Sequence, residues 1–312
     1  MLLSPFGMAR RIAPAALALA LLPLAAPAPA AHAATAPKLC TSTGDPKLAA
    51  KLSQDIRTAL SGRAGRVSVT LWDRRTDTSC AVGSTWHYDS ASVVKVTVMM
   101  AVLRRAQELK RNLTAREDAL ITAMITKSDN DATTQLWQSL GRARVQRFLT
   151  LAGLTHTTLN AGGAWGLTQI TAQDELRVLA LLDGVNTVLT PSSRAYGLRK
   201  MAAVVASQRW GTPAGAPTGV GVHVKNGWLP RATHGWRVHS IGDFTRTNGM
   251  NYRMVVLTQD NQTMAYGVTT IERIARAIHR DLNPGTKAAV VGRVPMLGPQ
   301  RSDGSDHGTF RR

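Results

Sequence analysis

The sequence predicts an α/β fold of the α+β kind: one antiparallel sheet built from both ends of the chain, with flanking helices and an inserted all-helical lobe. Strand-like alternation of apolar residues occurs early, at residues 66–72, and returns only after residue 220. Between Ala91 and about Ser207 helical patterns dominate. With 44% hydrophobic and 18% charged residues among 312, the chain has a globular composition and can bury a large core.

The first elements are a helix and two strands. Asp45-Pro46 is a typical helix start, so we expect a helix over residues 46–60. Apolar residues then alternate along residues 66–72, which predicts a strand, and residues 78–82 are expected to pair back with it.

The helical region is interrupted by turn-forming residues, at Lys110–Asn112, Gly141, Gly153, Gly162 and Pro191. Three late strands are then expected, over residues 221–226, 236–244 and 252–259. A last helix is predicted over about residues 268–282. The chain shows no internal repeat.

The first 33 residues have the pattern of an export signal. Arg10 and Arg11 precede the apolar run 12–26, and Ala31-His32-Ala33 fits a cleavage site. Prolines within the run argue against a membrane-spanning helix, although an uncleaved anchor and a twin-arginine route remain alternatives. We therefore expect a secreted protein with a signal peptide at 1–33, a flexible leader at 34–46, a catalytic domain at 47–283 and a flexible basic tail at 284–312.

Cys40 and Cys80 are the only cysteines. Export permits a disulfide between them, and two free thiols are the alternative. Neither belongs to a C-x-x-C motif and no acids lie nearby, so no metal site is expected.

The chain carries a net charge of +19, and the signal holds two of these charges and no acid, which leaves +17. Such an excess favours anionic surroundings, which for an exported protein are cell-wall polymers or membrane surfaces; simple solubility is the alternative. No nucleic-acid motif is present, so no nucleic-acid partner is expected, and we expect a monomer.

One lysine stands out in an apolar helix. Residues 93–103 are apolar all round except at Lys95, so this helix should be buried. A buried ammonium needs a partner, or its pKa falls and it becomes a base. Ser92 lies one helical turn earlier, near the helix N-terminus, where backbone N–H groups favour a developing oxyanion. Ser92 and Lys95 are therefore a candidate nucleophile and its activating base.

Two later motifs, Ser128-Asp129-Asn130 and Lys225-Asn226-Gly227, have purely structural interpretations when each is taken alone: a turn before a helix, and the entry to a hairpin. Together with the earlier serine and lysine, and in this order, they resemble the S-x-x-K, S-D-N and K-T-G boxes of class A β-lactamases and the related penicillin-binding proteins. The resemblance covers about residues 47–282, with further agreement at residues 121–136 and 208–217. It implies a β-lactamase/transpeptidase-like fold and no cofactor.

The resemblance also implies a role for each matched residue. Ser92 would attack a carbonyl and become acylated, Lys95 would take its proton, and Ser128 would relay a proton to the leaving nitrogen. The other matched residues would bind the substrate or, with the Ser92 N–H, form the oxyanion hole: Asn130, Lys225, Asn226, Gly227 and Trp228.

The third box departs from the family pattern, because Asn226 stands where threonine is usual. An amide cannot reproduce the geometry of a hydroxyl, so binding of a substrate carboxylate is in doubt. Arg231 and Arg237 lie nearby in sequence and either compensate or are ordinary surface arginines.

A larger departure concerns the loop that carries the deacylating acid of class A enzymes, in an E-x-x-L-N pattern. The nearest match begins at His156, and no Asp or Glu occurs between Gly141 and Gly166. His156 is either a substitute base or an ordinary loop histidine, and Trp165 either packs in the core or shapes the site. Asp174 and Glu175 are interpreted as first-turn residues of the next helix.

These observations predict a serine hydrolase that forms an acyl-enzyme with β-lactams or D-Ala-D-Ala-type amides and esters and releases the acyl group slowly. Two alternatives remain: an efficient class A β-lactamase with a non-standard deacylation base, and a non-catalytic relative that binds cell-wall material.

Overall fold

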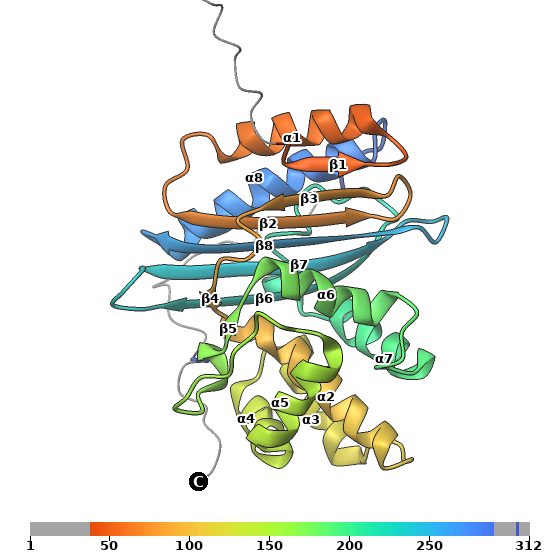
Figure 1. The fold of residues 1–312 in the computed structure, drawn as a ribbon, viewed down its shortest axis with the longest axis vertical. Coiled ribbons are helices and arrows are strands. Elements are labelled where there is room, and N and C mark those ends of the chain that lie inside the picture. The colour runs from red at the N-terminus through yellow and green to blue at the C-terminus, as the bar shows by residue number, and fades with distance from the viewer. Residues whose placement is uncertain (1–37, 290–303, 306–312) are drawn as a thin grey trace, which may run out of the picture. The chain divides into compact units, whose positions relative to one another are not determined.

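The computed structural model describes residues 38–289 and 304–305. Within them, six strands form a sheet in the order β1-β3-β2-β8-β7-β6, with every neighbouring pair antiparallel (Figure 1). Three strands precede the helical lobe and three follow it: β1 (Cys40–Ser42), β2 (Arg66–Asp73), β3 (Thr78–Val82), β6 (Gly221–Pro230), β7 (Trp236–Thr245) and β8 (Asn251–Asn261). The pairing of β2 with β8 joins the two groups, so the predicted fold class is confirmed.

Helices cover both faces of this sheet. On one face α1 (Pro46–Leu60) and α8 (Met264–Leu282) pack against each other and the strands, as Figure 1 shows in orange and blue. Their apolar sides enter one buried cluster, which includes Ile56 of α1 and Ile274 of α8. On the other face α6 (Ala172–Asp183) packs against β2, β7 and β8.

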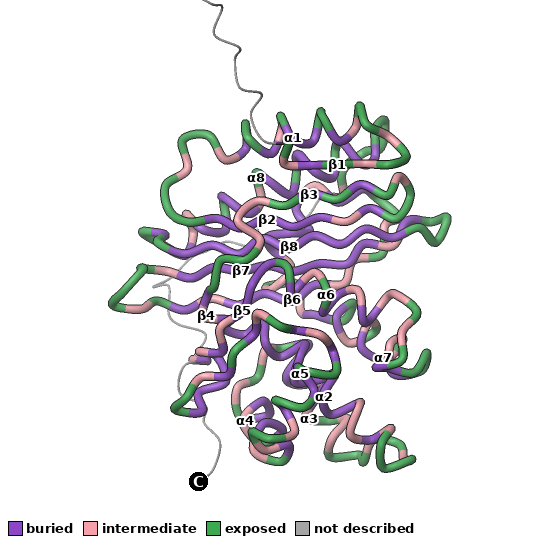
Figure 2. Tube along the Cα trace, viewed as in Figure 1, coloured by how far each residue is buried: buried purple, intermediate pink, exposed green. Residues whose placement is uncertain are grey.

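The inserted lobe is helical, as predicted. It contains the 3-10 helices η1 (Ala91–Val94), η2 (Trp165–Leu167) and η3 (Ala206–Gln208), and the α-helices α2 (Lys95–Glu108), α3 (Ala115–Thr126), α4 (Asn130–Leu140), α5 (Arg142–Ala152), α6 and α7 (Pro191–Ala202). A short ribbon of β4 (Tyr88–Asp89) and β5 (Gln169–Ile170) links it to the sheet. Residues 95–103 of α2 are all buried, in agreement with their apolar pattern (Figure 2).

The expected flexible leader over residues 34–46 is wrong for residues 40–42, because they form the edge strand β1. Cys40 is the register partner of Cys80 on β3, and a disulfide joins the two. The cross-link and the ladder together hold this segment on the sheet. Residues 1–37, which include the predicted signal peptide, lie outside the described part, as do residues 290–303 and 306–312 of the predicted tail.

The structure also differs from the sequence-based expectation elsewhere. The strand expected over residues 221–226 continues to Pro230, so Lys225-Asn226-Gly227 lies inside β6 rather than at a hairpin entry. The last helix begins at Met264, because Thr263 caps it by accepting from the Tyr266 N–H. In the expected tail, the Ala289 N–H donates to the Ala216 carbonyl, so this portion is tied to the loop before β6.

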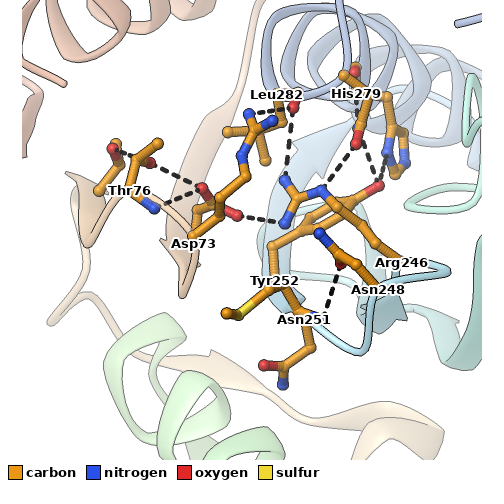
Figure 3. A network of polar contacts seen from close by, with 12 residues as sticks. Asp73, Thr76, Arg246, Asn248, Asn251, Tyr252, His279 and Leu282 are labelled. Carbon is orange, nitrogen blue, oxygen red and sulfur yellow. Dashed lines mark hydrogen bonds and ion pairs between the residues drawn. The ribbon is translucent and has the colours of Figure 1, made fainter. Parts of the chain in front are cut away.

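A polar network lies between the end of β7 and the C-terminal end of α8 (Figure 3). Arg246 Nη1 lies 2.7 Å from Asp73 Oδ1, and Arg246 Nε donates to Asn283 Oδ1 at 2.9 Å. Tyr252 OH and His279 Nδ1 are 2.8 Å apart, and burial lowers the pKa of His279 to about 4. The network therefore contains a buried ion pair and a neutral imidazole.

Among the helices of the described residues, none has the length and apolar character needed to cross a membrane.

Candidate active site

Ser92 and Lys95 lie on consecutive helical turns beneath the sheet edge. Ser92 is in η1, and α2 starts at Lys95, whose backbone N–H donates to the Ser92 carbonyl. Both residues are fully buried. Ala91, directly before Ser92, has a left-handed backbone with φ of +47°. Such a conformation costs a non-glycine residue about 1–3 kcal/mol and is concentrated at functional sites.

The Lys95 side chain donates to oxygen atoms of the second motif. Its Nζ donates to the Ser128 carbonyl at 2.6 Å, to Ser128 Oγ at 3.1 Å and to Asn130 Oδ1 at 2.6 Å. The sequence indicated that a buried lysine needs partners. Ser128 and Asn130 of the second motif, 33 and 35 residues along the chain from Lys95, are such partners. The first two boxes therefore meet at one amine.

Ser128 also contacts the lysine of the third box. Lys225 Nζ donates to Ser128 Oγ at 3.0 Å and to the Asn226 carbonyl at 2.7 Å, and Lys225 is fully buried. Ser128 has a left-handed backbone with φ of +58°, directly before the turn into α4 that Asp129 caps. One hydroxyl oxygen is therefore within hydrogen-bond distance of two amines from different parts of the fold.

Gly227 allows β6 to pass directly over η1. A Cβ on Gly227 would lie 2.7 Å from the Ser92 nitrogen and 2.9 Å from the Val93 nitrogen, closer than real side chains approach. Because β6 is the last strand of the sheet, only one of its edges is paired, with β7. The edge strand with Trp228 thus lies beside the N-terminus of η1.

Asn226 points away from Ser128, unlike its neighbour Lys225. Its Nδ2 donates to the carbonyls of Gln208 and Trp210, at 2.8 and 2.9 Å, and the side chain is buried. The amide is thus already engaged with the protein, which does not fit the substrate contact that the resemblance implied. Strand alternation is the physical reason, because neighbouring residues of β6 face opposite sides.

The two arginines considered as substitutes are directed at Asp89, three residues before Ser92. Arg237 is buried and its Nη2 pairs with Asp89 Oδ2 at 3.1 Å, while Arg231 Nε lies 3.8 Å from the same oxygen. These contacts hold the β6–β7 hairpin against β4.

The loop that precedes α6 brings an aromatic ring to Lys95. Lys95 Nζ lies 4.8 Å from the centroid of the Trp165 ring, and Trp165 Nε1 donates to Thr134 Oγ1 at 3.2 Å. A cation–π contact of this kind stabilises an ammonium. The sequence left open whether Trp165 packs in the core or shapes the site. The ring is fully buried, and it also faces Lys95.

His156 contacts the start of α6. Its backbone N–H donates to Asp174 Oδ2 at 2.9 Å, and its Nδ1 lies 3.6 Å from Asp174 Oδ1. Asp174 and Glu175 are in the first turn of α6, as predicted. His156 therefore makes an ordinary loop contact.

Residues 51–118 and 107–282 match the family model described as the beta-lactamase enzyme family. The chain belongs to this beta-lactamase enzyme family. Over 190 residues it is also 28% identical to the predicted lipoprotein LppW of Mycobacterium tuberculosis and to that of Mycobacterium bovis. That alignment spans 56% of this chain and 58% of the relative, a little over half the relative's length.

Solved class A beta-lactamases share the fold of this beta-lactamase-family chain. TLA-3 extended-spectrum beta-lactamase superposes with a TM-score of 0.67 at 17% identity, covering 75% of this chain and 98% of that one. A class A representative from Bacteroides cellulosilyticus gives 0.66 at 19% identity, with the same coverage. A variant of the reconstructed last common ancestor of Gram-negative class A enzymes gives 0.61 at 22% identity, covering 73% and 96%.

Glu175 of this beta-lactamase-family chain is a buried carboxyl whose Oε2 has no hydrogen-bond partner among the described residues. Burial, and then the charge of Asp174, raise the pKa of Glu175 well above 4.5. Between pH 4.5 and the raised pKa, the folded state holds a proton that the unfolded state releases. The free energy of unfolding therefore falls as the pH rises through this range. The slope approaches about 1.4 kcal/mol per pH unit.

Glu175→Gln is therefore expected to remove this slope and to stabilise the protein at about pH 8, with the advantage lost towards about pH 4. Urea unfolding at several pH values measures it. Glu108→Gln, at an exposed helix position, should leave the slope unchanged. An unaltered slope in Glu175→Gln would contradict the assignment.

Proposed function

We propose that the protein is a serine hydrolase that becomes acylated on Ser92 by β-lactams or by D-Ala-D-Ala-type amides and esters. One observation carries the proposal: Ser128 Oγ lies 3.1 Å from Lys95 Nζ and 3.0 Å from Lys225 Nζ. Lys95 itself is one helical turn after Ser92. A nucleophile, a base and a proton relay are the minimum set for acyl transfer to a serine.

The acylation step requires Lys95 in its deprotonated form, so the ammonium described above first releases one proton to solvent. Ser92 Oγ then attacks the carbonyl carbon, and its proton passes to Lys95 Nζ. The carbonyl oxygen becomes an oxyanion held by the N–H groups of Ser92 and Trp228. The C–N bond of the substrate then breaks, and the nitrogen receives the proton from Lys95 through Ser128. Lys225 adds positive potential beside Ser128, and Asn130 binds the substrate amide while it orients Lys95.

Deacylation is slow in this proposal. A water molecule that hydrolyses the acyl-enzyme needs a general base, and such a base contributes typically about 10²–10⁴-fold to the rate. In the loop before α6, the side chain of Trp165 faces Lys95. An indole ring cannot accept a proton, so Trp165 cannot be this base. His156 is engaged with Asp174 instead.

We further propose that the chain is exported and acts as a monomer at the cell wall. The leader pattern of residues 1–33 and the excess of positive charge support export and contact with anionic wall polymers. The relatives described as predicted lipoproteins point to the same side of the membrane. Residues 47–283 would be the catalytic domain.

A fluorescent penicillin, followed by intact mass, tests the proposal. We expect one adduct per chain, on Ser92, that persists for hours after excess reagent is removed, and none in Ser92→Ala. Rapid turnover of a chromogenic β-lactam would contradict slow deacylation and favour an efficient β-lactamase.

A second candidate is a non-catalytic binder of cell-wall material. It is favoured by Asn226, whose amide is engaged with backbone carbonyls where a substrate contact was expected. Absence of an adduct with every β-lactam and activated ester would favour this candidate.

A further inference from the structure

Two residues near the C-terminus, Gly304 and Ser305, lie against the candidate active site. The Gly166 N–H donates to the Ser305 carbonyl at 3.1 Å, and Ser305 is fully buried. Gly304 lies beside Asn130, because a Cβ placed on Gly304 would be 2.8 Å from Asn130 Nδ2.

Each contact involves a residue that touches Lys95 or is next to one that does. Asn130 accepts a hydrogen bond from Lys95 Nζ, and Gly166 directly follows Trp165, whose ring faces the same ammonium. Gly304 and Ser305 therefore touch two structures that form the site: the start of α4 and the 3-10 helix η2.

Gly166 fits this contact closely. A Cβ on Gly166 would lie 2.2 Å from the Ser305 carbonyl oxygen and 2.5 Å from Ser305 Cβ, so any side chain there would displace Ser305. Gly166 does not have the left-handed backbone that favours glycine. Within the described residues, its lack of a side chain is thus required by Ser305 rather than by the backbone.

The described part of the chain after α8 runs towards the same site. Lys287–Ala289 bond to the loop before β6, the strand that carries Lys225.

We propose that the C-terminal segment centred on Gly304–Ser305 binds in the acyl-transfer site as an intramolecular peptide ligand and competes with substrate. The effect on acylation rests on the proposed function, whereas the docking itself does not. The ligand class is a short peptide with small residues at the contact with Gly166 and Asn130.

The first test is the rate of acylation of the full chain by a fluorescent penicillin. Gly166→Ala should displace Ser305 and raise the second-order rate constant by about 10-fold, as loss of a tethered competitor would. A chain ending at Ala289, which keeps α8 and its contacts, should show a similar increase. Gly162→Ala, in the same loop but away from Ser305, is the matched control and should behave as the wild type. Equal rates in all four chains would overturn the inference and leave the proposed function standing.

The second test does not depend on acylation. A fluorescently labelled peptide of residues 298–312 should bind the chain ending at Ala289, by anisotropy, and should bind the full chain at least about 10-fold more weakly. If no chain is acylated, this result still supports the docking while the proposed function fails. Equal binding to both chains, or binding to neither, would overturn the inference.

Discussion

Lys95→Met is expected to reduce the rate of acylation of Ser92 by about 10³–10⁴-fold. Methionine has a similar length and no charge, so it fills the buried position, and the Ser128 carbonyl and Asn130 Oδ1 lose the donor that Lys95 supplies. It can neither take the Ser92 proton nor donate to Ser128 and Asn130, the partners that Lys95 Nζ now contacts. Single-turnover formation of the penicillin adduct, by intact mass, measures the effect.

Two further variants separate proton transfer from charge and from packing. Lys95→Arg keeps the charge but cannot act as a base, so it should be as slow as Lys95→Met. Lys200 lies 4.8 Å from the Tyr196 ring, the same separation as Lys95 from Trp165, but belongs to α7. Lys200→Met should acylate normally. Acylation of Lys95→Met at the wild-type rate would refute the role of the lysine.

Arg246→Leu is expected to lower the free energy of unfolding by about 3–5 kcal/mol. The reason is that Asp73 is fully buried and that Arg246 Nη1 lies 2.7 Å from its carboxylate. Figure 3 shows this ion pair. Removal of the guanidinium leaves a buried carboxylate without its countercharge, and Asn283 loses a donor. Urea unfolding followed by circular dichroism measures the loss.

An exposed ion pair provides the matched control for this stability effect. Arg276 pairs with Glu272 at 3.1 Å, but its side chain is 58% exposed. Arg276→Leu should therefore cost at most about 1 kcal/mol. Adding Asp73→Asn to Arg246→Leu should recover part of the loss, since no charge is then buried. A cost for Arg246→Leu no larger than that for Arg276→Leu would show that the buried pair contributes little.

The order of elements and the helical-turn spacing of Ser92 and Lys95 could be predicted from the sequence because both depend on short-range patterns. Alternation along residues 66–72 and the apolar run around Lys95 are local signals, and the spacing from Ser92 to Lys95 fixes one helical turn. The same reasoning placed Asp174 and Glu175 correctly in the first turn of α6. The leader prediction failed at residues 40–42 because β1 depends on pairing with β3 and on the disulfide to Cys80.

Contacts between distant segments required the tertiary structure. The sequence indicated that Lys95 needs a partner, but only the fold shows that Ser128 and Asn130 supply it and that Trp165 covers it. The orientation of Asn226 depends on where the loop at 208–210 passes.

The sequence by itself therefore determined the class of fold, the serine with its lysine, and the three boxes, because each is encoded within a few consecutive residues. The tertiary structure decided that Lys95 and Lys225 both contact Ser128 Oγ. It also decided that the Asn226 amide bonds to backbone carbonyls and that Ser305 lies against Gly166. Such contacts join residues tens to hundreds of positions apart, and pairing across that separation is set by packing of the whole chain rather than by local propensity.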